Sequence, residues 1–401
     1  MQAETVADTS LSKVGATIAS YVVFTFLGYF TIGLALGVLP VFIHQQLGYN
    51  AMIAGIVISL QYVTTFLFRG YAGNIVDKKG PKPAVVLGMI GFTLSGILLF
   101  AVYALRAHTT LSLIILIITR LMTGFGEGLI GASPINWAIL AVGDKNTAKA
   151  ISYNGIASYG ALAAGAPVGI LLHNGYGIGS IGILIFLIGI AGFIYAKNKT
   201  PLKGNAGIPG ESFLKVLKAV SPYGICLTLS GLGFGTISTF ITLYYAYLHW
   251  QNAVLCLSVF SSMFIVGRIL FANSIDKYGG MKIAICCIAL ETIGLLIIWL
   301  AYVPHVALIG AGVTGLGFSL VFPALGVEAV KIVPSSNKGA ALGGYGLFLD
   351  ISLGLTGPLV GSIASHFGMT YIFLFSMLMV FTGLVLALII NTRKKQVEVS
   401  V

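Results

Sequence analysis

Twelve long apolar runs dominate this chain of 401 residues. A helix rises about 1.5 Å per residue, so a run of about twenty residues crosses the roughly 30 Å hydrocarbon core of a bilayer. Runs this long, without polar alternation, indicate helices rather than the strands of a membrane barrel. We therefore expect an all-α integral membrane protein with twelve transmembrane helices in two pseudo-symmetric six-helix halves. The runs are Val14–Ile43, Ala51–Ala72, Ala84–Leu105, Leu111–Leu140, Ala150–Leu172, Ile178–Ala196, Ala219–Leu248, Ala253–Ala272, Ile283–Val303, His305–Val330, Ala340–Ser365 and Thr370–Ile390.

Composition excludes several other classes of protein. Hydrophobic residues make up 57% of the chain and charged residues 8%, against roughly 25% charged in soluble domains. The net charge of +11 does not indicate nucleic-acid binding, because the basic residues lie in short loops between apolar runs. The four cysteines lie inside apolar runs and indicate neither disulfides nor a metal site. No catalytic constellation or phosphate-binding loop is visible, so we expect neither an enzyme nor a cofactor.

A short basic loop occurs twice, and this repeat predicts the internal symmetry. Every matched residue is separated by 199 residues, as from Asp77 to Asp276. The matched residues are Arg69, Asn74, Asp77, Lys78 and Gly80 in the first copy, and Arg268, Asn273, Asp276, Lys277 and Gly279 in the second. The separation is close to half the chain. We expect a first half over residues 1–196, a linker over 197–215 and a second half over 216–401.

Each residue type in the first loop has a physical role. Gly73 is expected to let two helices approach closely, and Gly80 followed by Pro81 predicts a tight turn. Lys78 and Lys82 are expected to hold the loop at the cytoplasmic face.

The distribution of basic residues predicts the orientation. Almost all of the lysines lie near the termini, in the linker or in alternate loops, whereas Arg106 lies in a loop of the opposite side. Cytoplasmic loops are enriched in Lys and Arg, so both termini and the linker are expected in the cytoplasm. The N-terminus lacks the basic segment of a signal peptide, and the first apolar run is therefore expected to be retained.

Together, the two six-helix halves, the basic linker and the repeated loop resemble the major facilitator superfamily. The first loop matches the family pattern G-x-x-x-D-x-x-G-x-K at Gly73, Asp77, Gly80 and Lys82. The second copy departs from it, with Ala272 and Met281 at the positions of the first Gly and the Lys. The resemblance covers essentially the whole chain. It implies a multi-pass secondary transporter of the bacterial inner membrane, working as a monomer.

Further motifs resemble those of drug–proton antiporters within this family. Arg120 and Gly124 match the R-x-x-x-G element of proton-coupled members. Gly165-Ala166-Pro167 resembles the Gly-Pro element of antiporters with one residue inserted, and Gly357-Pro358 is a cleaner copy. The resemblance therefore implies proton-coupled export of a small molecule.

Charges at bilayer depth cost roughly 2.5–3.5 kcal/mol each on insertion scales, so each needs a reason. Asp350 lies near the middle of the eleventh run with no Lys or Arg near it in sequence. It is our first candidate for binding the coupling proton, against a packing role. Glu127 is the second candidate, and Arg120, seven residues earlier on the same helical face, is expected to assist. Glu291 in the ninth run is expected to be structural or interfacial.

Two larger sets complete the candidate site. Polar and aromatic residues at mid-span are expected to bind an amphipathic substrate: Tyr29, Gln61, Tyr159, Phe234, Tyr244 and Phe318. The two loops and the inner end of the tenth run are expected to gate transport, with Glu328 bound to Arg268 or Lys331. The gating set is Arg69, Gly73, Asp77, Lys78, Gly80, Lys82, Arg268, Asp276 and Glu328.

Two alternatives remain open on the sequence. One is proton-coupled uptake, or symport, of a sugar or small metabolite. The other is a membrane receptor or sensor that transports nothing, although such a protein has no need for two copies of the inner loop. The sequence does not identify the substrate, and sugars, lipophilic drugs and small metabolites all fit it.

Overall fold

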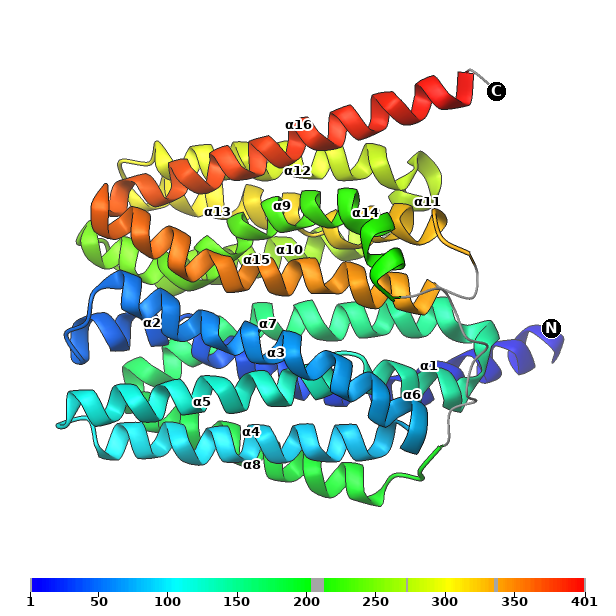
Figure 1. The fold of residues 1–401 in the computed structure, drawn as a ribbon, viewed down its shortest axis with the longest axis horizontal. Helices are drawn as coiled ribbons and strands as arrows, with labels where there is room; N and C mark the ends of the chain where they lie inside the picture. Colours follow the sequence, from blue (N-terminus) through cyan, green and yellow to red (C-terminus); the bar gives the residue numbers. More distant parts are fainter. Residues whose placement is uncertain (1, 203–212, 272, 335–337, 400–401) are drawn as a thin grey trace. The chain divides into compact units, whose positions relative to one another are not determined.

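The computed structural model describes residues 2–202, 213–271, 273–334 and 338–399. Regular secondary structure in these ranges is entirely helical (Figure 1). Twelve helical segments are long and apolar enough to cross a membrane, which confirms the expected fold class. The main helices are α1 (Gln2–Leu36), α3 (Ala51–Lys79), α4 (Pro81–Ala104), α5 (Thr109–Ile130), α6 (Ser133–Val142), α7 (Thr147–Tyr176), α8 (Ile178–Asn198), α9 (Phe213–Tyr247), α10 (Ala253–Leu270), α12 (Gly280–Trp299), α13 (Pro304–Phe318), α14 (Val321–Lys331), α15 (Lys338–His366) and α16 (Ile372–Val399).

Short helical segments join or extend the long helices. They are α2 (Leu39–Val41), η1 (Phe42–Gln46), η2 (Asp144–Asn146), α11 (Ser274–Tyr278) and η4 (Met369–Tyr371). The fourth apolar run is divided into α5 and α6, with Pro134 in the first turn of α6. The tenth run is likewise divided into α13 and α14. Proline fits the first turn of a helix because its missing N–H has no partner there.

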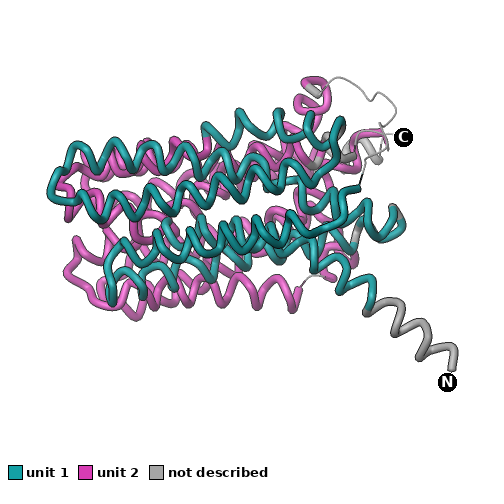
Figure 2. Tube along the Cα trace, turned by 90° about the horizontal axis from the view of Figure 1, so that it is seen from below, with its two compact units in different colours: residues 1–35, 63–206 teal, residues 36–62, 207–401 magenta. Residues whose placement is uncertain are grey.

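The chain divides into two compact units (Figure 2). Unit 1 contains residues 1–35 and 63–206, and unit 2 contains residues 36–62 and 207–401. Residues 36–62, which lie in the first half of the sequence, thus cluster with the second half. The division into sequence halves at residues 196 and 216 stays a prediction, and part of its linker lies outside the described residues.

Unit 1 is held together by close backbone contacts. Helices α4 and α8 lie side by side (Figure 1), and a Cβ added at Gly182 would lie 2.7 Å from the backbone nitrogen of Phe100. On α7, an added Cβ at Gly165 would lie 2.7 Å from the carbonyl oxygen of Phe30 in α1. Small residues allow membrane helices to pack this closely, and the dispersion attraction between the closely packed backbones stabilises the bundle.

Unit 2 is built around α9, which packs against α10, α12, α13, α14, α15 and α16. Its membrane span is 83% buried, the highest share of the twelve. Helix α15 contacts α9 on one face, and the first part of α3 contacts another face of α15. Residues carried by α9 and α15 therefore form the interior of this unit.

Candidate functional site

A glycine seam joins α15 to the first part of α3 inside unit 2. A Cβ added at Gly357 would overlap the backbone of Gly55, and one added at Gly361 would lie 2.9 Å from the carbonyl oxygen of Ala51. Gly354 lies one turn before Gly357 on α15. A Cβ added at Gly354 would lie 3.4 Å from the Cβ of Tyr62. The two backbones are in direct contact along this seam. Any larger side chain at Gly55 or Gly357 would force the helices apart.

Asp350 lies on the same face of α15 as this seam. Positions 350, 354, 357 and 361 follow the spacing that aligns side chains along one helical face. The Asp350 side chain is 5% exposed. The first candidate for proton binding is thus a buried carboxyl one turn from the end of a helix–helix seam.

The opposite face of this part of α15 is fixed to α9. The Thr228 hydroxyl donates to the carbonyl oxygen of Phe348 at 2.9 Å, and the Ser352 hydroxyl donates to the carbonyl oxygen of Thr228 at 2.8 Å. Phe348 and Ser352 flank Asp350 in sequence. This reciprocal pair of hydrogen bonds therefore fixes the helical turn that carries the carboxyl.

Glu127 and Arg120 occupy the interior of unit 1. Both side chains are buried, at 3% and 1% exposed. The Thr65 hydroxyl of α3 donates to Glu127 Oε2 at 2.9 Å and lies 3.3 Å from the carbonyl oxygen of Gly124. Gly128 allows this approach, because its Cβ position lies 2.9 Å from Phe68 Cβ. A buried carboxyl and a buried guanidinium thus share one face of α5.

The six residues expected to bind substrate are divided between the two units. Tyr29, half-buried, and Tyr159, buried, belong to unit 1, whereas buried Gln61 belongs to unit 2. In unit 2, the rings of Phe234 and Phe318 are stacked with centroids 4.9 Å apart. Tyr244 lies ten residues further along α9, a rise of about 15 Å.

The aromatic residues of unit 2 pack mainly on one another. Phe234 also contacts Phe260 at 5.8 Å, and Phe264 lies 6.0 Å from Phe318. Tyr244 packs edge-on against Phe373, with centroids 4.8 Å apart. Such pairs stabilise a core by about 0.5–1.5 kcal/mol beyond the area they bury. Their roles in substrate binding remain predictions.

The turn expected at the basic loop is present in both copies. Gly80 has φ +82° and directly precedes α4, and Gly279 has φ +89° and directly precedes α12. Only glycine adopts this conformation without strain. Gly73 differs from expectation: no described atom lies within 4 Å of a Cβ built there. Helix α3 packs at this level through the neighbouring Ala72 and Val76 instead.

The expected gating charges have different environments. Arg69 lies against Gly131, with one guanidinium nitrogen 3.1 Å from the Cβ position. The Arg268 guanidinium lies over the Phe264 ring at 5.7 Å. Asp276 is exposed and forms no ion pair with a described residue. Asp77 and Lys78 lie in the last turn of α3. Lys78 is exposed, and the side chain of Asp77 lies outside the described residues.

Glu328 is bound to Lys331, one of the partners expected for it. Its Oε1 accepts a hydrogen bond from Lys331 Nζ at 2.9 Å. The same oxygen lies 2.9 Å from the Cβ position of Gly280, the first residue of α12. A carboxylate beside a helix N-terminus is stabilised by the helix dipole.

Sequence reasoning missed an anchor at the start of the linker. Lys82 Nζ donates to the carbonyl oxygens of Lys197 and Lys199, each at 2.7 Å. Lys199 in turn donates to Ser20 Oγ at 2.8 Å and lies 4.3 Å from the centre of the Tyr21 ring. A cation that binds the last carbonyls of a helix stabilises its C-terminus. The family pattern includes Lys82, but no sequence signal reveals that its acceptors lie at the end of α8.

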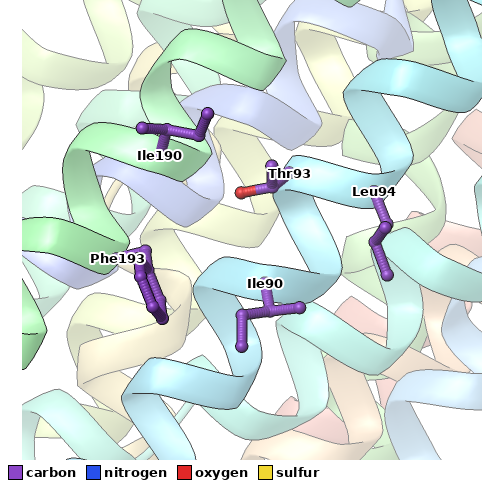
Figure 3. Close-up of a pocket in the computed structure, with 5 residues that line it drawn as sticks. All are labelled: Ile90, Thr93, Leu94, Ile190 and Phe193. Atoms are coloured by element: carbon purple, nitrogen blue, oxygen red, sulfur yellow. The ribbon is translucent and has the colours of Figure 1, made fainter.

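An apolar groove lies between α4 and α8 (Figure 3). Its volume is about 210 Å³, and it is lined by Ile90, Thr93, Leu94, Ile190 and Phe193. The Thr93 hydroxyl donates to the carbonyl oxygen of Met89. None of the residues expected to bind substrate or protons lines this groove, which fits contact with lipid chains.

The fold is that of a helical membrane protein with charged side chains buried among its helices. The family model described as Major Facilitator Superfamily matches residues 21–272 and 223–400. The chain belongs to the major facilitator superfamily, as its sequence motifs predicted. It therefore carries small molecules across a membrane and is a transporter rather than an enzyme.

The chain is similar in sequence to proteins of bacteria. The chain is 51% identical over 391 residues to an uncharacterized MFS-type transporter of Pseudomonas aeruginosa, covering 97% of this chain and 96% of that protein. It is 46% identical over 383 residues to an uncharacterized MFS-type transporter of Burkholderia pseudomallei, covering 95% and 93%.

Solved structures share the fold at low sequence identity. The nucleoside transporter NupG, in a mutant form, aligns with a TM-score of 0.70 at 15% identity, covering 94% of this chain and 99% of that one. The human organic anion transporter MFSD10 aligns with a TM-score of 0.68 at 14% identity, covering 92% and 98%.

Proposed function

We propose that this protein is a proton-coupled secondary transporter that exports a small amphipathic molecule in exchange for protons. The observation that carries the proposal is the position of Asp350. Its carboxyl is buried on the face of α15 that forms the seam with α3, one turn from the Gly354 position. When the seam separates, the turn of α15 next to this carboxyl loses its cover.

A carboxyl in this position is suited to coupling. Burial disfavours the charged form of the Asp350 carboxyl, which therefore binds a proton readily. In the proposed cycle, this proton and the substrate compete for the same site. A proton is taken up where the pH is low and released where it is high, and the gradient drives exchange. With cytoplasmic termini, as the lysine distribution predicts, the seam lies toward the outer side of a bacterial inner membrane.

Two Gly-Pro elements support antiport. Each lies at a backbone contact: Gly165, before Pro167, contacts α1, and Gly357, before Pro358, contacts α3. Glycines remove the side chains that would lock the helices, and each proline removes one backbone hydrogen bond. Both features favour helices that separate and close again during a transport cycle.

The other buried charges have assigned roles in this proposal. Glu127, held by Thr65, is a second protonatable group, and Arg120 on the same face of α5 adjusts its charge. Asp77 and the two basic loops bias the equilibrium between conformations. One chain contains both halves, so it works as a monomer.

The proposal is tested in proteoliposomes with a pH-sensitive dye inside and the gradient applied in either direction. A panel of cationic amphipathic compounds, nucleosides and sugars is supplied one at a time. Proton movement opposite to substrate movement supports antiport, whereas parallel movement supports the symport alternative. Absence of proton movement with every transported compound refutes proton coupling.

Asp350→Asn is the decisive variant. Asparagine keeps the size and hydrogen-bonding capacity of the protonated acid but releases no proton. We expect gradient-driven accumulation to be lost while exchange of labelled for unlabelled substrate continues. Glu127→Gln, measured beside it, reports on the second carboxyl. If Asp350→Asn still accumulates substrate with an unchanged pH profile, Asp350 is a packing residue.

A further inference from the structure

Glu291 is a second buried carboxyl in unit 2 to which the proposed transport cycle assigns no role. Its side chain is 0% exposed, and it lies on α12 facing α9. Oε2 is hydrogen-bonded to Ser230 Oγ, whereas Oε1 is buried with no hydrogen-bond partner among the described residues. An ionised carboxylate with a buried, unsatisfied oxygen is energetically unfavourable.

Among the residues that the structure describes, the Glu291 carboxyl forms no ion pair. A Cβ built at Gly233 of α9 would lie 2.7 Å from Oε1, 2.9 Å from Leu295 Cδ1 and 3.0 Å from Val380 Cγ2 of α16. From α13, the Gly317 position lies against the Glu291 backbone nitrogen. The described neighbours of the carboxyl on these elements are therefore apolar or hydroxylic.

Charged groups on the adjoining helices lie at their ends, and the titratable Cys226 of α9 lies one turn before Ser230 on the same face. Glu328 of α14, which is bound to Lys331, lies beside Gly280 at the start of α12. Gly280 precedes Glu291 by eleven residues, a rise of about 16 Å along the helix. His305 of α13 is exposed at the opposite end. Cys287, one turn earlier on α12, is the titratable group next to Glu291 along the same helix.

Ser230 links this carboxyl to the segment that carries Asp350. Ser230 and Thr228 are two residues apart on α9 and so point to opposite sides of the helix. Ser230 binds Glu291, and Thr228 makes the reciprocal hydrogen bonds to α15 on either side of Asp350. Helix α9 is thus hydrogen-bonded to Glu291 on one side and to the turn of α15 that carries Asp350 on the opposite side.

We propose that Glu291 is a proton-binding site that stays occupied throughout the transport cycle and acts as a positioning residue for Asp350. The neutral acid forms a hydrogen bond to Ser230 that sets the position of α9 and, through Thr228, of α15. The Glu291 side chain is 0% exposed, so water has no direct contact with the carboxyl and its proton is retained. The positioning role rests on the proposed function, whereas the proton occupancy does not.

Proton occupancy is measured by infrared spectroscopy on purified protein carrying isotope-labelled glutamate. We expect a carbonyl band of a protonated glutamic acid that persists across the neutral pH range. The band should be lost in Glu291→Gln and retained in Asp350→Asn. If the band is missing from the native protein, or survives in Glu291→Gln, then Glu291 is not the proton-binding site. This experiment needs no substrate and stands even if proton-coupled transport fails its own test.

Positioning is measured as the pH dependence of gradient-driven transport. Glu291→Gln, which mimics the neutral acid, should keep the native rate within about twofold and the same pH midpoint. Ser230→Ala removes only one hydroxyl and should slow transport about fivefold and move the midpoint, since a typical hydrogen bond is lost. Glu291→Leu should do the same, provided it elutes as a folded protein. Unchanged midpoints in Ser230→Ala refute the positioning role, and loss of proton coupling in Glu291→Gln shows that the proton is exchanged instead.

Discussion

Gly357→Ala tests whether the seam between α15 and α3 controls access to Asp350. The methyl group would overlap the backbone of Gly55, and the Ser59 side chain is also in contact range. Neither backbone can rotate away as a side chain does. The substitution therefore acts on the closed seam and leaves the separated helices unaffected.

The size of the effect follows from overpacking. Inserting a methyl group into a closely packed contact costs typically 1–3 kcal/mol. If the whole cost falls on the closed state, the equilibrium between closed and open seam shifts about 5- to 150-fold toward open. The shift should be larger for Gly357→Leu, which cannot be accommodated by small adjustments.

The assay measures labelling of Ala51→Cys by a membrane-impermeant maleimide. Ala51 is 6% exposed and its carbonyl oxygen lies at the Gly361 position of the seam. The four native cysteines are first replaced by serine. Labelling that depends on opening should accelerate by the same roughly 5- to 150-fold in Gly357→Ala, because the rate follows the open population when closing is fast.

The matched control is Gly343→Ala on the same helix. No described atom lies within 4 Å of a Cβ built at Gly343, so the methyl group has room and labelling should stay at the native rate. Equal labelling of both variants and the native protein would refute the seam as a controlling contact. Acceleration in Gly343→Ala as well would show that α15 is merely destabilised.

Three further predictions concern unit 1. Lys82→Met removes the donor to the α8 C-terminus and should lower the free energy of unfolding by about 1 kcal/mol, read as a lower melting temperature, while the exposed Lys79→Met should not. Gly80→Ala forces a left-handed φ on a residue with a Cβ and should cost about 1–3 kcal/mol by the same measure; Gly70→Ala, in open space, is its control. Thr65→Val keeps the shape but removes the donor to Glu127 Oε2, and we expect a shifted pH dependence of transport; an unchanged profile would exclude Glu127 from proton coupling.

The sequence by itself determined the features that depend on local chemistry. Run length and hydrophobicity are sufficient to predict twelve membrane helices. The thickness of the bilayer sets the length of each span, and a helix satisfies all of its backbone hydrogen bonds within the span. Gly80 and Pro81 predicted a turn correctly because only glycine tolerates the required φ. The 199-residue repeat predicted internal symmetry, and a glycine with positive φ precedes both α4 and α12.

Other features depend on which helices become neighbours, and only the tertiary structure decided these. Gly73 fits a family pattern, yet α3 uses the neighbouring face, with Ala72 and Val76, to pack. The acceptors of Lys82 are carbonyl oxygens at the end of α8, which carry no side-chain signal in the sequence.

The environments of the buried carboxyls illustrate the same limit. Hydropathy placed Asp350 and Glu291 in the membrane. It did not show that Asp350 lies beside the contact of α15 with α3, or that Glu291 is buried against α9. That difference arises from the rotation of each helix about its own axis. Rotation is set by contacts between small residues far apart in the chain, such as Gly55 with Gly357, which a single sequence does not reveal.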